Sequence, residues 1–423
     1  MLNKVFAIFA IMALALVITV PVMAEDTIKI AYIDPLSGAM AGVGDAGYKH
    51  FQYNAELLNA AGGVLGGKKF EIVPFDNKVS PQDTLIQLKN AIDQDIRIVA
   101  QGNGSSVAGA LIEAINKHNE RNPDNQLIYL NYAAVTPSFT NEQCSFWHFR
   151  FDAHVDMKIA AITNYIKGQK DIKKVYLMNQ DYVFGHAVSD ASKAMLKEKR
   201  PDIKIVGDSF TPLGKVKDFS PYVAKIQASG ADTVISGNWG ADMSLLVKAA
   251  KDAGLKAQFY TFYGNGLGAP KAIGEAGIGI LNSVTEWHLD LNQEEKNAED
   301  EKFFLDYQEK YSSRGEVPYY YGRIGTTMQM LAAAIEKAHS TKAKDIAYAL
   351  EGMEYQTPYG KVTMRAEDHQ LIQPLYISTY AKAGQGTVKY DAENTGVGFK
   401  TIQRIEAADT AMPTTCKMER PEK

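Results

Sequence analysis

The sequence predicts an α/β protein of two doubly wound lobes, each with a mostly parallel sheet, joined by several hinge crossings. Segments with strand-like and helix-like spacing alternate from Thr27 onward, which is typical of parallel sheets covered by helices on both faces. Two such series of similar size follow each other. Between them the residue pattern changes at residues 146–152, where aromatic and polar residues alternate. Because no low-complexity linker separates the series, we expect several short crossings between the lobes.

The two series define the elements in chain order. In the first, we predict strands at 27–33, 69–75, 96–100 and 127–132, and helices at 45–59, at 81–93 and after residue 105. In the second, we predict a helix at 157–166 and strands at 174–179, 203–206, 232–236 and 258–261. Farther on, the spacing predicts helices at 294–311 and 319–338 and a late strand at 375–380.

The first 24 residues are typical of an export signal. Lys4 gives a positive start, residues 5–20 are uncharged and apolar, and Val22-Met23-Ala24 offers small residues for cleavage. An uncleaved membrane anchor is the alternative, because the apolar stretch is long for a signal. We expect cleavage, which would leave the mature chain in the periplasm.

Composition narrows the classes of partner. The 423 residues carry 45 basic and 49 acidic side chains, and this mildly acidic balance gives no electrostatic reason to expect nucleic acid. The two cysteines, Cys144 and Cys416, suggest one disulfide in an exported protein, with two buried thiols as the alternative. Such a bond would tie the middle of the chain to its tail.

A Gly/Ser-rich turn at residues 101–109 is the strongest candidate for a binding site. It follows a predicted buried strand and opens a predicted helix, so its backbone N–H groups and the hydroxyls of Ser105 or Ser106 can hold an anion. The same serines are also typical helix caps. A second strand end with small residues, at 133–137, favours the binding interpretation, since ligands gather at the carboxyl ends of parallel strands.

The sequence contains few patterns that are typical of catalytic or metal-binding sites. The histidines form no H-E-x-x-H motif, no G-x-S-x-G elbow is present, and residues 264–268 match neither a dinucleotide fingerprint nor a P-loop. We therefore expect no enzyme activity, no metal and no cofactor. Aromatic residues instead gather at predicted strand ends and helix starts, as if lining a cleft for a small organic solute. They are Tyr132, Tyr182, Trp239, Tyr263 and Tyr319-Tyr320-Tyr321.

Five short motifs occur in order along the chain, namely Ile33-Asp34-Pro35-Leu36-Ser37-Gly38, Asn59-Ala60-Ala61-Gly62-Gly63-Val64, the Ser105-Ser106 turn, Asn131-Tyr132-Ala133-Ala134 and Asp181-Tyr182-Val183-Phe184-Gly185. With these motifs the chain resembles, from about Thr27 to Met418, the periplasmic solute-binding proteins of branched-chain amino acid ABC importers. The resemblance implies the type I fold, known as the Venus flytrap. It also implies a solute held between two closing lobes and delivered to the membrane permease subunits, without chemistry on the solute.

The resemblance also implies which residues hold the solute. The ligand carboxylate would lie on Ser105, Ala133, Ala134 and Val135, although the family often has threonine at the last position. Tyr182 would close over the ligand, and Trp239 would stand at the aromatic position of the second lobe. Tyr263 stands where the family has an acid for the α-ammonium, so either Asp181 or Asp242 replaces that acid or the solute lacks an amine.

We therefore expect a monomeric receptor for an amino acid or a related small carboxylate. A receptor for an aromatic or other organic acid or amide without an α-amine is the first alternative. An exported hydrolase and a ligand-sensing module are the alternatives from other classes. The expected division is a signal at 1–24, lobe 1 at 25–148 and 286–352, and lobe 2 at 149–285 and 353–423.

Overall fold

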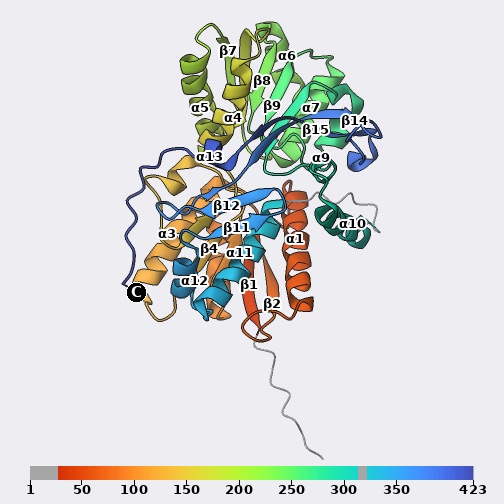
Figure 1. The fold of residues 1–423 in the computed structure, drawn as a ribbon. Helices are drawn as coiled ribbons and strands as arrows, with labels where there is room; N and C mark the ends of the chain where they lie inside the picture. Colours follow the sequence, from red (N-terminus) through yellow and green to blue (C-terminus); the bar gives the residue numbers. More distant parts are fainter. Residues whose placement is uncertain (1–26, 313–321, 423) are drawn as a thin grey trace, which may run out of the picture.

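The computed structural model describes residues 27–312 and 322–422, and these form two α/β lobes joined end to end (Figure 1). The predicted export signal and Tyr319-Tyr320-Tyr321 lie outside the described residues. Both main sheets are mostly parallel, which confirms the predicted fold class.

The lower lobe in Figure 1 is built on a five-stranded sheet of order β2-β1-β3-β4-β5, in which every pairing is parallel. Its strands are β1 (Ile28–Asp34), β2 (Phe70–Asp76), β3 (Ile98–Gln101), β4 (Ile128–Asn131) and β5 (His148–Arg150). Its helices are α1 (Ala41–Ala60), α2 (Pro81–Asp93), α3 (Ser105–Arg121), α11 (Gly322–Ala338) and α12 (Ala343–Leu350), with the 3₁₀ turn η1 (Pro137–Thr140). The last two helices bring late sequence into the same hydrophobic core as β1 to β4.

The upper lobe contains a seven-stranded sheet of order β15-β14-β10-β9-β8-β6-β7, parallel except at β14 and β15. Its strands are β6 (Lys174–Gln180), β7 (Lys204–Thr211), β8 (Thr233–Ser236), β9 (Gln258–Thr261), β10 (Leu281–Thr285), β14 (Leu375–Lys382) and β15 (Val397–Ile405). Its helical segments are α4 (Val155–Lys167), α5 (Val183–Lys199), α6 (Ser220–Ser229), α7 (Gly240–Asp252), α8 (Ala269–Ile273), η2 (Gly274–Gly277) and η3 (Ala392–Asn394). Residues from both faces of the sheet are buried in two core clusters.

Three connections cross between the lobes. The chain passes upward between β5 and α4 and returns after β10 through α9 (Leu291–Glu294) and α10 (Ala298–Ser312), where Tyr307 packs on His50 of α1. It then forms a small antiparallel sheet of β11 (Glu354–Thr357), β12 (Gly360–Met364) and β13 (Leu371–Ile372) before entering β14. Met364 and Leu371 of this sheet join the core of the lower lobe, although the sequence assigns residues after 352 to lobe 2. The predicted lobe boundaries stay a prediction.

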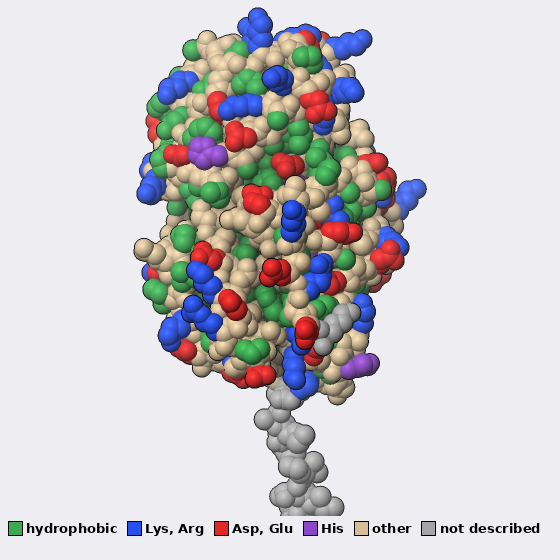
Figure 2. All heavy atoms as spheres, turned by 90° about the vertical axis from the view of Figure 1, so that its left-hand side faces the viewer, with side chains coloured by type: hydrophobic (Ala, Val, Ile, Leu, Met, Phe, Trp, Pro, Cys, Tyr) green, Lys and Arg blue, Asp and Glu red, His purple; other side chains and the backbone are tan. Residues whose placement is uncertain are grey.

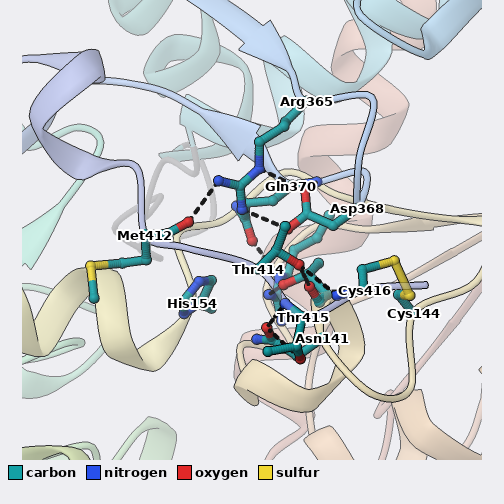
Figure 3. A network of polar contacts seen from close by, with 12 residues as sticks. Asn141, Cys144, His154, Arg365, Asp368, Gln370, Met412, Thr414, Thr415 and Cys416 are labelled. Carbon is teal, nitrogen blue, oxygen red and sulfur yellow. Dashed lines mark hydrogen bonds and ion pairs between the residues drawn. A yellow bond between two sulfur atoms is a disulfide. The ribbon is translucent and has the colours of Figure 1, made fainter. Parts of the chain in front are cut away.

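The C-terminal tail crosses the hinge region once more. After α13 (Ala407–Thr410) it runs down one side of the lower lobe, where Cys416 forms a disulfide with Cys144 (Figures 1 and 3). Thr414 Oγ1 donates to the carbonyl of Thr140 at 2.6 Å, and Arg365 Nη1 donates to the carbonyl of Met412 at 2.7 Å. The predicted disulfide is therefore confirmed, and it links the C-terminal tail to the lower lobe.

On the face drawn in Figure 2, acidic and basic side chains are interspersed, and neither sign of charge forms a continuous patch. Among the described helices, none is long and apolar enough to cross a bilayer.

Candidate functional site

A cleft lies between the two lobes at the carboxyl ends of their central strands. Residues after β3 and β4 form its lower wall, and residues after β6, β8 and β9 form its upper wall. It encloses about 530 Å³ of empty space, part of which opens to solvent. Its lining residues are Val43, Gly102, Asn103, Gly104, Ser105, Ala133, Ala134, Val135, Tyr182, Phe184, Trp239, Gly240, Tyr263, Gly266, Leu267 and Arg323.

The Gly/Ser turn brings the start of α3 to this cleft. Gly104, the residue before the helix, has a φ of +100°, a conformation that favours glycine, and Ser105 begins the helix with 2 % of its surface exposed. The first N–H groups of a helix have no acceptor within the helix, so they offer a partial positive charge to the cleft. The Ser105 hydroxyl is bonded to no base in the described chain, which suits a ligand donor better than a nucleophile.

A buried carboxylate fixes the shape of that turn from behind. Asp34 accepts hydrogen bonds from the backbone N–H groups of Gly102 and Asn103, at 3.2 and 3.0 Å, and from the Tyr132 hydroxyl at 2.5 Å. Burial raises the pKa of Asp34 to about 7, and these donors oppose that shift. Tyr132, predicted to face a cleft, therefore lies behind the turn, where its hydroxyl also accepts from Asn103 Nδ2.

The second lower turn is shaped by Asn131 at the end of β4. Its Oδ1 accepts from the backbone N–H groups of Ala133 and Ala134, at 3.2 and 2.8 Å, and its Nδ2 donates to the carbonyl of Ala134. These bonds curl residues 133–135 back beneath the cleft. Because Val135 has no hydroxyl, this turn lines the cleft mainly with apolar side-chain surface.

Two aromatic residues of the upper lobe form a hydrogen-bonded pair in the cleft. Trp239 Nε1 donates to the Tyr182 hydroxyl at 2.9 Å. Tyr182 directly precedes α5 and Trp239 directly precedes α7, so two more helix N-termini border the same space. The first turns of α3 and α5 hold no acidic residue, so their partial positive charges favour an anion, whereas Asp242 in the first turn of α7 offsets the charge of the third helix start.

At the other side of the cleft, Tyr263 and Arg323 adjoin a cluster of buried charges. Arg323, at the start of α11, donates from Nη1 to both carboxylate oxygens of Glu286 at 2.9 Å, and its Nε lies 3.7 Å from Asp152 Oδ2. Lys158 Nζ pairs with Asp152 Oδ1 at 2.9 Å and lies 5.0 Å from the centre of the Tyr263 ring. Burial raises the pKa of Tyr263 well above its ordinary value and lowers that of Lys158.

The structure brings seven of the eight predicted binding residues to one cleft, namely Ser105, Ala133, Ala134, Val135, Tyr182, Trp239 and Tyr263. Ser106 is exposed and does not line it. Adjacent residues of a helix point about 100° apart, so only one of the two serines can face the space.

Neither acid proposed for an ammonium group lines the cleft. Asp181 is exposed and pairs with His186 at 2.9 Å. Asp242 is buried, and its Oδ2 accepts from Gln180 Nε2 and the Gly214 backbone N–H. Among the described lining residues there is no aspartate or glutamate.

Sequence reasoning missed Arg323, Phe184 and Val43. Phe184 belongs to the same family-like motif as Tyr182. Arg323 comes from α11, far along the chain, and no neighbouring sequence motif indicates that it lines the cleft. In the described part of the chain, no cluster of three or more His, Cys, Asp or Glu side chains could hold a metal ion.

Comparison with known proteins gives consistent matches. The family model described as periplasmic binding protein matches residues 27–385. The chain is 33% identical over 408 residues to the "Leu/Ile/Val-binding protein homolog 4" of Brucella melitensis, covering 94% of each chain.

Solved structures agree with the fold. A leucine-, isoleucine-, valine-, threonine-, and alanine-binding protein from Brucella ovis, in a closed conformation, superposes with a TM-score of 0.81 at 31% identity, covering 93% of this chain and 100% of the other. A solute-binding protein from Rhodopseudomonas palustris in complex with 3,4-dihydroxybenzoic acid gives a TM-score of 0.74 at 18% identity, covering 90% and 98%. At that identity the second likeness concerns the fold alone.

Proposed function

Because this chain belongs to the periplasmic binding protein family, we propose that it is the solute receptor of an ABC importer and captures a small organic carboxylate. One observation carries the carboxylate assignment: three helix starts and the Ser105 hydroxyl converge on a cleft whose described lining contains no acidic side chain. Such a surface stabilises a negative charge.

The same observation argues against an α-amino acid as the preferred solute. Its carboxylate would lie on α3, and its ammonium group, on the neighbouring carbon, would be buried in the same cleft with no lining carboxylate to pair with it. Leaving a buried charge unpaired costs about 3–5 kcal/mol. The relatives named for leucine, isoleucine and valine support the receptor class, whereas the cleft of this chain favours an acid without an amine.

Capture requires both lobes. Ser105 belongs to the lower lobe, and Tyr182 and Trp239 belong to the upper lobe, so one solute can touch all three only when the lobes are closed. Contacts made only in the closed state shift the equilibrium toward closure. The closed form would then present itself to the permease subunits and release the solute chemically unchanged.

The predicted signal at residues 1–24 supports export, and with the family it favours a periplasmic location. We propose that the mature receptor acts as a monomer, since the cleft is completed by the two lobes of one chain.

Calorimetric titration of the purified mature protein tests this function. Leucine and 4-methylpentanoate form a matched pair, because they differ only in the α-amine, and benzoate represents a planar acid. We expect 4-methylpentanoate or benzoate to bind more tightly than leucine by about tenfold or more. Tighter binding of leucine would contradict the proposal that the preferred solute lacks an α-amine. If none of these carboxylates binds, the proposal that the protein is a carboxylate receptor is wrong.

A further inference from the structure

The positions of the strands show that the cleft has two chemically different ends. In the lower sheet β3, β4 and β5 are neighbours, so the residues after β5 lie about 10 Å from the residues after β3, at roughly 4.8 Å per strand. Ser105 follows β3, whereas Asp152, the ion-pair partner of Lys158 and neighbour of Arg323, follows β5. The carboxylate end and the Arg323 end are therefore separated by the width of a small solute.

The upper sheet repeats this order. Glu286 follows β10 and Tyr263 follows its neighbour β9, while Trp239 and Tyr182 follow β8 and β6 farther across the sheet. Since Arg323 pairs with Glu286, the β10 side of the upper sheet faces the β5 side of the lower one. Tyr263 and Arg323 consequently share the end opposite to Ser105.

Both groups at this second end can donate hydrogen bonds, and the Tyr263 hydroxyl can also accept one. Arg323 carries only N–H donors, and the Tyr263 hydroxyl forms no hydrogen bond within the described chain. Both residues line the cleft. A solute atom placed here meets hydrogen-bond donors, which an oxygen acceptor satisfies and a methyl group does not.

The charges behind this end cancel. Arg323 and Lys158 are balanced by Asp152 and Glu286, and the four side chains are between 0 and 8 % exposed. A solute bringing a second full charge would therefore upset a balanced buried cluster, which is costly at low dielectric. A neutral acceptor adds hydrogen bonds without adding charge.

From these contacts we propose that Tyr263 and Arg323 select a second, uncharged oxygen of the solute. The preferred solute is then a small monocarboxylate with a hydroxyl or carbonyl oxygen at its far end. This inference rests on the proposed function, because the first carboxylate must already lie at Ser105. The rings of Tyr182, Trp239 and Phe184 along the cleft suit a planar or apolar body between the two polar ends.

Isosteric acids test the selection. In one series, 4-methylbenzoate, 4-hydroxybenzoate and terephthalate place a methyl, a hydroxyl or a second carboxylate at the far end of the same ring. In a flexible series, hexanoate and 5-hydroxypentanoate exchange a terminal methyl for a hydroxyl. Calorimetry on the wild-type protein is expected to show the hydroxyl acid of at least one series binding about tenfold or more tighter than its methyl partner, and tighter than terephthalate.

Variants test which residues cause the preference for a hydroxyl over a methyl group at the far end of the solute. Tyr263→Phe keeps the ring and removes the hydroxyl, so the preference for hydroxyl over methyl should fall to about threefold or less. Tyr260→Phe is the matched control, because Tyr260 is buried in β9 and does not line the cleft, and it should keep the full preference. Arg323→Lys keeps the positive charge but loses the fork that binds Glu286, and it should also reduce the preference.

The outcomes separate this inference from the proposed function. Equal binding of methyl and hydroxyl acids, tightest binding of terephthalate, or an unchanged preference in Tyr263→Phe would overturn the inference while leaving a carboxylate receptor in place. Absence of binding by every acid in both series would overturn the carboxylate function and, with it, this inference.

Discussion

The indole N–H of Trp239 donates to the hydroxyl of Tyr182 at 2.9 Å, and both side chains line the cleft from the upper lobe. In the closed cleft this bond satisfies an indole donor that has little access to water, since Trp239 is 6 % exposed. In an open form, water can replace the hydroxyl. The pair therefore contributes most when the lobes are closed.

This relationship predicts the effect of Tyr182→Phe. Closure would bury the Trp239 N–H without a partner, which costs about 1–3 kcal/mol, so solute affinity should fall by about 5- to 150-fold. The unfolding temperature of the solute-free protein should change little. Calorimetry and thermal unfolding measure the two quantities. Equal affinity in the variant and the wild type would show that the pair does not contribute to closure.

Ser105→Ala removes a hydroxyl at the carboxylate end of the cleft. Hydrogen bonds to charged groups contribute about 1.5–3 kcal/mol, so affinity for the preferred acid should decrease by about 10- to 150-fold. Ser106→Ala is the matched control, because Ser106 is exposed and does not line the cleft. An equal loss of affinity in both variants would contradict the assignment of the anion site to the inner serine.

Met40 of the lower lobe packs against the upper lobe next to residues that line the cleft. It precedes α1 of the lower lobe, is 4 % exposed, and lies so close to Gly240 of the upper lobe that a Cβ there would be 2.7 Å from its Sδ. Burying a methionine side chain contributes about 1.5–3 kcal/mol, so Met40→Ala should weaken solute binding by about tenfold or more. Small-angle scattering with saturating solute should still show closure. Met195→Ala, on α5, should leave affinity unchanged.

The fold was predictable wherever local patterns decide structure. The helix predicted at 81–93 has the bounds of α2, because Ser80 accepts a hydrogen bond from the Asp83 N–H and Pro81 suits the first turn. Strands β1, β6 and β8 were also predicted to within about two residues, since their short apolar runs are unambiguous.

Long-range packing decides what the sequence could not predict. The strands β11 and β12 are short and partly exposed, and β13 has two residues, so their spacing carries little signal, and the structure alone places them against the lower lobe. Arg323 reaches the cleft because the chain returns from the upper lobe through α9 and α10 before α11 begins, which depends on the whole topology. The eight-residue run after Gln101 could indicate a turn, but the role of Asp34 in shaping it comes from a contact across 68 residues.

The buried histidines predict acid sensitivity. Burial lowers the pKa values of His50, His148, His154 and His369, that of His50 to about 3, so these rings stay neutral in the folded protein. The unfolded chain binds their protons below about pH 6.5. Their contribution is therefore fully present above pH 6.5 and is lost as the pH falls, by at most about 1.4 kcal/mol per pH unit for each ring. Urea unfolding at pH 5, 6 and 7.5 measures this slope.

A conservative variant isolates one histidine. His154 caps α4 by accepting from the Asp156 N–H at 3.2 Å, and asparagine can cap in the same way without titrating. His154→Asn should therefore reduce the acid slope by at most about 1.4 kcal/mol per pH unit. An unchanged slope would show that this ring is protonated in the folded state.

Asp34 predicts an opposite and smaller dependence. Its pKa is raised to about 7 in the folded protein, so the folded state holds more protons than the unfolded chain between about pH 4 and 7. The stability that this group contributes is present below about pH 4 and is lost as the pH rises through 7. Asp34→Asn removes this loss, and its unfolding free energy should rise more steeply from pH 5 to 7 than that of the wild type.

The Cys144–Cys416 disulfide predicts how strongly the tail holds the fold together. The bond closes a span of 272 residues, and the tail beside it also bonds to Thr140 and Asn141, just beyond the turn that lines the cleft. Replacing both cysteines by serine should lower the free energy of unfolding by about 2–5 kcal/mol, since the unfolded chain gains freedom. Adding dithiothreitol should destabilise the wild type by a similar amount and leave the double variant unchanged, which separates loss of the bond from effects of the serines. A wild-type protein whose unfolding temperature is the same with and without reductant would show that the noncovalent contacts of the tail alone fasten it to the lower lobe.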